Sequence, residues 1–248
     1  QARVGSTRLP GKVLKEVLGK PMIEMQIERL RRARRIDRLM IATSNDSRDD
    51  ALAELCGRND VDCYRGNLED VLDRLYQAAR GYHPTDVVRL TGDCPLADPG
   101  IIDRVIEFHV TGGYDYVSNT LKPSFPDGLD VEVLHFSVLE QAWREASLPS
   151  EREHVTPFIY NHADRFRVGS YSGSVNLSQL RWTLDEPQDL EFVRRVYEAL
   201  YPTKPDFVMG DVLDLLASQP ELAQINAIFE RNEGYQKSLV EEARYLKQ

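Results

Sequence analysis

Short apolar runs alternate with stretches of helical spacing along the first 110 residues. The runs 39–42, 61–64 and 86–90 have the length and composition of buried strands. Before, between and after these runs, apolar residues recur at helical spacing in 22–35, 49–57, 67–79 and 99–108. Strands and helices that alternate through short connections predict an α/β fold, a mixed, mostly parallel sheet with helices on both faces.

The alternation breaks after residue 110. Further strands are predicted at 114–118, 129–134, 165–171 and 180–184, and further helices at 137–146, 150–162, 187–201, 211–218 and 221–231. There is no internal repeat or low-complexity linker, so a single domain over 1–248 is predicted.

The first twelve residues carry three cations, Arg3, Arg8 and Lys12, on a stretch rich in small residues. Small residues let backbone N–H groups approach a ligand, and Arg and Lys bind phosphate oxygens. The stretch therefore suits a polyphosphate, although a basic surface loop has the same composition. Because the chain begins with Gln1, we expect a lost N-terminal stretch that could hold the strand feeding this loop.

Composition narrows the possible partners. The net charge of −9 is unlike that of general nucleic-acid binders, so no nucleic acid is expected. No run approaches the roughly 20 apolar residues that span a bilayer, so no membrane contact is expected. Three cysteines without a C-x-x-C pair predict reduced thiols in a cytoplasmic protein.

Two aspartates follow apolar strands. Asp93 lies in a Gly-Asp-x-Pro turn after 86–90, and Asp185 follows 180–184. Ligands bind at the carboxyl ends of parallel strands, and Mg²⁺ prefers such oxygen ligands together with substrate phosphates. The pair predicts a Mg²⁺ site, while the alternative is that each aspartate only caps a turn or helix. Asp189 is interpreted as a helix-surface residue.

Several of these stretches together resemble the sugar-acid cytidylyltransferases (CMP-sugar synthetases), including those for 3-deoxy-manno-octulosonate and acylneuraminate. The resemblance lies in residues 1–12, 18–21, 42–44, 89–96 and 183–190. The bacterial spore-coat polysaccharide branch is most similar, through residues 125–133, 151–156 and 232–235. The resemblance implies a Rossmann-like nucleotide-diphospho-sugar transferase fold. It also implies transfer of CMP from CTP to an acidic sugar or related acceptor, with release of pyrophosphate, for surface polysaccharide biosynthesis.

The resemblance also implies roles for individual residues. Arg3, Arg8, Lys12 and Asp93 would be catalytic, with Mg²⁺ on Asp93 and Asp185. The nucleotide would be bound by those three cations and by Ala2, Gly5, Ser6, Thr7, Ala42, Thr43, Ser44, Arg74 and Thr91, with Arg65 nearby. The nucleotide-binding part would span 1–110, the acceptor and dimerisation part 114–171, and a helical tail 202–248. Relatives commonly form homodimers.

The acceptor would meet the middle segment. Its candidate ligands are Asp127, Asp130, Glu132, Arg152 and His154. The alternatives are that Asp130 and Glu132 line a solvated strand face and that His154 is a plain surface histidine. This segment departs from the octulosonate enzymes, so the acceptor stays open and includes phosphonates.

Two other functions share the fold. One is a nucleotide-sugar-dependent glycosyltransferase, which the absence of Asp-x-Asp after a strand at 87–93 disfavours. The other is a binding module without activity, which the intact cations and aspartates disfavour.

Overall fold

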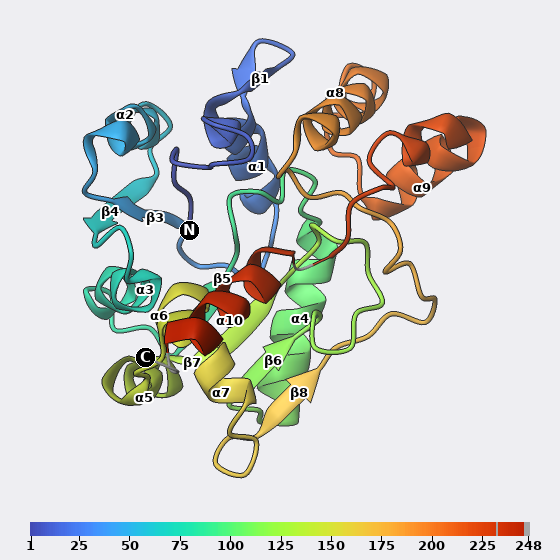
Figure 1. The fold of residues 1–248 in the computed structure, drawn as a ribbon. Helices are drawn as coiled ribbons and strands as arrows, with labels where there is room; N and C mark the ends of the chain where they lie inside the picture. Colours follow the sequence, from blue (N-terminus) through green and yellow to red (C-terminus); the bar gives the residue numbers. More distant parts are fainter. Residues whose placement is uncertain (232, 246–248) are drawn as a thin grey trace.

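A four-stranded sheet forms the centre of the computed structural model, which describes residues 1–231 and 233–245; Asn232 and 246–248 lie outside the described residues. Its strand order is β5-β7-β6-β8, and β3 and β4 form a separate parallel pair (Figure 1). A short antiparallel pair, β1 and β2, precedes the first helix. The strands are β1 (Glu16–Val17), β2 (Lys20–Pro21), β3 (Met40–Ser44), β4 (Asp62–Gly66), β5 (Asp86–Arg89), β6 (Tyr116–Ser118), β7 (Glu132–His135) and β8 (Val168–Ser170).

Helices cover the sheet on both faces. Neighbouring residues of β6 and β7 point to opposite sides, so that Val117 and Val133 pack with α4 and α8, while Tyr116 and Leu134 pack with α3, α5 and α7. This two-sided burial confirms the predicted α/β fold. The helices are α1 (Met22–Leu30), α2 (Asp50–Arg58), α3 (Val71–Arg80), α4 (Pro99–Gly112), α5 (Phe136–Glu145), α6 (Pro149–His154), α7 (Pro157–Tyr160), α8 (Pro187–Leu200), α9 (Met209–Ser218) and α10 (Glu233–Tyr245).

One strand of the central sheet runs against the others. β7 pairs antiparallel with both β5 and β6, whereas β6 and β8 are parallel. The segment that contains β6 and β7 therefore supplies the middle of the sheet and is largely buried there.

Three predicted elements differ from the structure. The helix expected over 150–162 is two short helices, because Val155 has a positive φ of 74° and Pro157 begins α7. Residues 180–184 form no strand, and the only bridge there pairs Arg181 with Asp127. Only a 3-10 helix, Pro220–Gln224, occupies 221–231. Helix α10 lies within the predicted helical tail 202–248, although no individual helix was predicted over its residues, and it packs against α6 (Figure 1).

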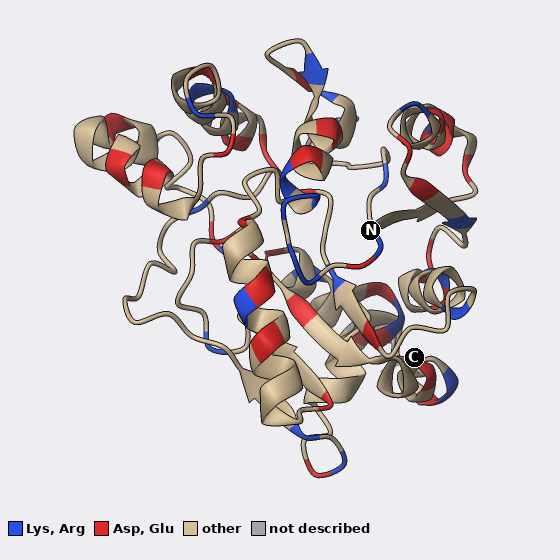
Figure 2. Cartoon of the chain, turned by 180° about the vertical axis from the view of Figure 1, so that it is seen from behind, with Lys and Arg blue, Asp and Glu red and all other residues tan. Residues whose placement is uncertain are grey.

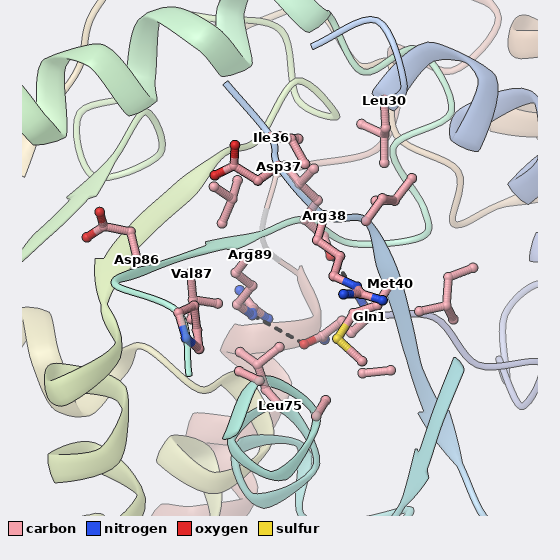
Figure 3. A pocket seen from close by; sticks show the side chains of 18 of the residues that line it. Gln1, Leu30, Ile36, Asp37, Arg38, Met40, Leu75, Asp86, Val87 and Arg89 are labelled. Atoms are coloured by element: carbon pink, nitrogen blue, oxygen red, sulfur yellow. Dashed lines mark hydrogen bonds between the residues drawn. The ribbon is translucent and has the colours of Figure 1, made fainter. Parts of the chain in front are cut away.

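The chain begins between β3 and β5. Gln1 bonds to the backbone of Leu90 and Gly92, and the N–H of Ala2 donates to the Ala42 carbonyl. Next to Gln1, a cavity of about 930 Å³ lies between β3 and β5, with Met40 of β3 on one side and Val87 and Arg89 of β5 on the other (Figure 3).

The charged residues and the apolar character of the helices are distributed as the composition of the chain leads one to expect. Acidic and basic positions are interspersed over the helices seen from behind (Figure 2). Within residues 1–231 and 233–245, no helix combines the length and the apolar character needed to cross a lipid bilayer.

Candidate active site

Three segments that are distant in the sequence meet beyond the carboxyl end of β5. The Leu184 N–H and the Thr183 hydroxyl donate to the Asp93 carbonyl at 2.8 Å and 3.1 Å. These bonds hold the segment before α8 against the turn after β5. The basic loop reaches the same place because Gln1 is bonded to that turn.

Lys12 joins the two aspartates. Its Nζ lies 3.0 Å from Asp93 Oδ2 and 2.7 Å from Asp185 Oδ1. Arg8 adds an ion pair to Asp185 at 3.1 Å. The structure thus brings Arg8, Lys12, Asp93 and Asp185 together, as the sequence predicted.

The electrostatics of Asp93 follow from these contacts. Burial alone would raise its pKa, but the Lys12 ammonium and a 2.5 Å hydrogen bond from Thr91 outweigh burial and hold the pKa well below its usual range. Asp93 is therefore ionised at neutral pH. One ammonium between two carboxylate oxygens occupies a position that suits a cation with oxygen ligands.

A cavity of about 240 Å³ opens beside the aspartates. It receives side chains from the basic loop, the middle segment and the C-terminal segment. Its lining residues are Arg8, Thr91, Asp93, Cys94, Asp127, Asp130, His154, Arg181, Thr183, Asp185, Glu230, Glu233, Gly234 and Tyr235.

Asp127 and Asp130 face this cavity from the loop before β7. Gly128 between them has φ 102°, and a Cβ there would lie 2.5 Å from the Thr183 nitrogen, so only glycine allows the loop this close to 181–183. Arg231 lies 2.5 Å from Asp130 and 3.6 Å from Asp127. Asp130 therefore does not lie on the solvated strand face that was the alternative interpretation for it.

The sequence interpretation of Asp189 was wrong. Asp189 is fully buried, and its two oxygens accept hydrogen bonds from Arg181 at 2.9 Å and 2.8 Å. It also accepts from the backbone N–H groups of Asp185 and Glu186, so it orients Asp185 at the start of α8. The sequence signal for this role was the position of Asp189 as the third residue of α8, which begins at Pro187 after the N-cap residue Glu186. An acidic side chain at this position commonly accepts hydrogen bonds from the backbone at the start of a helix.

Two predicted acceptor ligands lie away from the cavity. Glu132 is buried, and its carboxylate is paired with Arg89 and accepts 2.6 Å bonds from Tyr116 and Thr156. Arg152 is paired with Asp70 at the start of α3. Glu132 and Arg152 therefore form ion pairs within the protein and do not line the cavity. His154 does line the cavity, where its Nε2 lies 2.9 Å from the Ser238 hydroxyl.

The C-terminal segment closes the cavity and was missed as part of the site. Glu233 lies 3.5 Å from Arg8, and the Tyr235 ring meets the His154 ring edge-on at 4.9 Å. Arg231, the ion-pair partner of Asp130, belongs to the same segment. The motif 232–235 had pointed to family resemblance without suggesting this contact.

The predicted nucleotide ligands on β3 are buried. Thr43 and Ser44 belong to β3 itself rather than to the loop after it. The Ser44 backbone N–H donates to the buried carboxylate of Asp49, and its hydroxyl is bonded to the same carboxylate. Ala42 accepts from Ala2, and the Thr43 hydroxyl has no partner among the described residues. A role for these three residues in base binding stays a prediction.

Arg3 and Arg74 form a second positive feature. Arg74 is buried on α3, and burial together with the nearby Arg3 charge lowers its pKa. Its guanidinium is bonded to the carbonyls of Asn67 and Leu68, and Nε has no acceptor within the described chain. No ion pair joins Arg3 to a carboxylate of the described residues. Two like charges placed so suit an anion.

The remaining predicted residues are in the loops. The Ser6 N–H donates to the Val4 carbonyl at 2.8 Å, and its hydroxyl accepts from Leu9. Gly5 packs against the Arg48 guanidinium, and Thr7 is exposed. Arg65 is bonded to the Ser44 and Asp46 carbonyls and is paired with Asp50.

Asp130 should give the protein a pH-dependent stability. Burial, opposed by Arg231 and reinforced by Asp127, raises its pKa to about 7. The folded protein then holds a proton that the unfolded chain loses above about pH 4, so this stabilisation is complete below pH 4 and lost as pH rises through about 7. We expect Asp130→Asn to flatten the decline in free energy of unfolding between about pH 4 and about pH 7, measured by urea titration at a series of pH values. Parallel profiles for the two proteins would contradict this.

A basic loop that faces two aspartates beyond the strand ends of a Rossmann-like α/β fold defines a nucleotidyltransferase. The family model for cytidylyltransferases matches residues 1–238. The chain belongs to the cytidylyltransferase family.

Relatives extend over nearly the whole chain. The spore coat polysaccharide biosynthesis protein SpsF of Bacillus subtilis is 34% identical, covering 90% of this chain and 94% of its own. The structure of a cytidylyltransferase from Leptospira borgpetersenii aligns with a TM-score of 0.87 at 29% identity, over 93% of this chain and 97% of that one. A CMP:2-keto-3-deoxy-manno-octonic acid synthetase complexed with CTP shares the fold, with a TM-score of 0.58 at 19% identity over 79% and 95%.

Proposed function

We propose that this protein transfers CMP from CTP to an acidic sugar-like acceptor, with release of pyrophosphate and with Mg²⁺ as the cofactor. The observation that carries the proposal is the position of Lys12, which brings the basic loop within 3.0 Å of both candidate metal ligands. We propose further that the protein acts in the cytoplasm, as a homodimer, in the synthesis of a bacterial surface polysaccharide. The role named for the Bacillus subtilis relative and the three free cysteines support this setting.

Separate groups of residues would bind the metal and the triphosphate. Asp93 and Asp185 would hold Mg²⁺, which neutralises charge on the phosphoryl oxygens when bound. Lys12 and Arg8 would then bind the triphosphate, and Arg3 and Arg74 would add positive charge on the side of β3. The acceptor oxygen attacks the α-phosphorus, a new P–O bond forms, and the bond to the β-phosphate oxygen breaks. Fixed cations stabilise the charge that develops, so no protein nucleophile is needed.

Charge balance bears on how the acceptor is oriented. Beyond the metal ligands, the cavity is lined by Asp127, Asp130, Glu230 and Glu233, and both of its arginines, Arg8 and Arg181, are paired with carboxylates. A carboxylate of the acceptor would therefore lie toward the metal. Its hydroxyl groups would lie toward Asp127 and Asp130, which accept hydrogen bonds. A phosphonate acceptor would be held in the same way.

The assay is pyrophosphate release from CTP with a panel of sugar acids and phosphonates. Release that depends on one acceptor and on Mg²⁺ supports the proposal. No release with any acceptor, together with transfer from a nucleotide-sugar, would favour the glycosyltransferase alternative, against which the family assignment already counts.

CTP should raise the melting temperature of the protein more than ATP or GTP, because a ligand that binds the native state stabilises it by mass action. The measurement is a thermal shift with each nucleotide at equal concentration and in excess Mg²⁺. Equal shifts for the three nucleotides would argue against selection of cytosine.

A further inference from the structure

A cluster of two histidines and one aspartate lies at the end of the sheet opposite the candidate active site. Asp86 is the first residue of β5, and the site aspartate Asp93 follows the other end of that strand. His135 is the last residue of β7 and the register partner of Asp86. His109 comes from the last turn of α4. In Figure 3, Asp86 lies on the other side of the strand cavity from Gln1.

The three side chains converge on one point. Asp86 Oδ1 lies 2.6 Å from His135 Nδ1 and 3.0 Å from His109 Nε2. All three candidate ligand atoms lie within 4.8 Å of one another. Tetrahedral Zn²⁺ with ligands at about 2.0–2.1 Å places them about 3.4 Å apart. This spacing falls inside the observed range, so small side-chain rotations would suffice.

The position of the cluster suits an ion. The His109 side chain is fully buried at the end of α4, and its Nε2 is directed at Asp86 Oδ1. The neutral imidazole of histidine is the form that binds metals. Without an ion, Nε2 faces the Asp86 carboxylate as a donor; with an ion on Nε2, the ring proton would lie on Nδ1, which has no hydrogen-bond partner among the described residues. His135 is 36% exposed and gives solvent, and hence an ion and a fourth water ligand, a way in.

We propose that Asp86, His109 and His135 bind a Zn²⁺-class transition-metal ion, with water completing its coordination. Two imidazoles and one carboxylate select such an ion over Mg²⁺, which prefers oxygen ligands. The ion would tie α4 to both β5 and β7 and so brace the sheet behind the active site. This site is separate from the proposed Mg²⁺ site and does not depend on the proposed reaction.

The test measures metal stoichiometry in the whole chain. A Cys63→Ser background removes the exposed thiol, and excess Mg²⁺ competes at Asp93 and Asp185. Chelator-treated protein is loaded with Zn²⁺, passed through gel filtration and analysed by elemental mass spectrometry. We expect one Zn²⁺ per chain, a higher melting temperature than for the chelated protein, and visible absorption of tetrahedral Co²⁺ when Co²⁺ replaces Zn²⁺.

His135→Ala should remove this binding. Loss of a residue that only orients a metal ligand already costs about 10–100-fold in metal affinity, so loss of a direct ligand should cost at least ~100-fold. His83→Asn is the matched control, because His83 is exposed nearby and asparagine tolerates its positive φ of 49°. If the alanine variant is unstable, His135→Gln replaces it. Less than a tenth of an equivalent in the parent protein, or unchanged affinity in the His135 variant, would overturn the proposal.

Discussion

Asp93→Asn is expected to lower Mg²⁺-dependent turnover of CTP by about 10²–10³-fold while the protein stays folded. Asparagine at this position would keep the shape of the side chain but lose the charge that faces Lys12 at 3.0 Å and that would hold the metal. The backbone carbonyl of residue 93, which accepts from Leu184, is unaffected, so the segments should stay together. The measurement is initial-rate pyrophosphate release at saturating CTP, with circular dichroism melting as the check on folding.

The matched control for this variant is Asp164→Asn. Asp164 is exposed in the turn before β8, so its substitution changes net charge equally without touching the site. We expect its turnover to equal that of the parent protein. Normal turnover by a folded Asp93→Asn variant would remove Asp93 from the catalytic site.

Arg181→Met is expected to lower the free energy of unfolding by about 3–5 kcal/mol, because a buried charge pair is broken on one side only. The Arg181 side chain is 6% exposed, and its partner Asp189 is fully buried. Methionine replaces the volume but leaves the charge of Asp189 without its cation and that of Asp127 with Arg231 alone. In a chain of this size the melting temperature should fall by about 10 °C. Urea unfolding gives the free energy directly.

Arg195→Met on the exposed side of α8 provides the comparison. Arg195 is paired with Glu191 at the surface, where such pairs contribute little, so a change within about 0.5 kcal/mol is expected. Equal effects of the two substitutions would show that the Arg181–Asp189 pair has no special importance for stability.

The sequence predicted correctly that the two aspartates that follow apolar segments lie close together. Asp93 and Asp185 each follow an extended apolar segment, and the structure brings both to Lys12. The convergence was predictable although 180–184 is not a strand, because an extended segment bonded to the Asp93 turn delivers its last residue to the same place. The α/β class followed from the alternation of elements in the first 110 residues.

Residues whose roles depend on tertiary partners could not be placed. Glu132 alternates with apolar residues, a pattern typical of a solvated face, yet Arg89 makes its burial tolerable. Arg231 likewise acquires its role from Asp130, which is 101 residues away. Asp189 is paired with Arg181, only 8 residues away, but the burial of this pair depends on the tertiary fold. Helix α10 has only a weak apolar stripe and is fixed by polar contacts such as His154 with Ser238, so periodicity gave no signal for it.

For the proposed reaction, in which Mg²⁺ and a nucleotide both bind, the ammonium of Lys12 has a thermodynamic consequence. While it bridges Asp93 and Asp185, the proposed Mg²⁺ would have to compete with the protein's own charge. A nucleotide that draws Lys12 onto its phosphates relieves that competition, and the ion in turn releases Lys12 for the nucleotide. Linkage makes such an effect reciprocal. One side chain would thereby couple the two binding equilibria, so that the loaded state forms cooperatively and half-loaded states stay scarce.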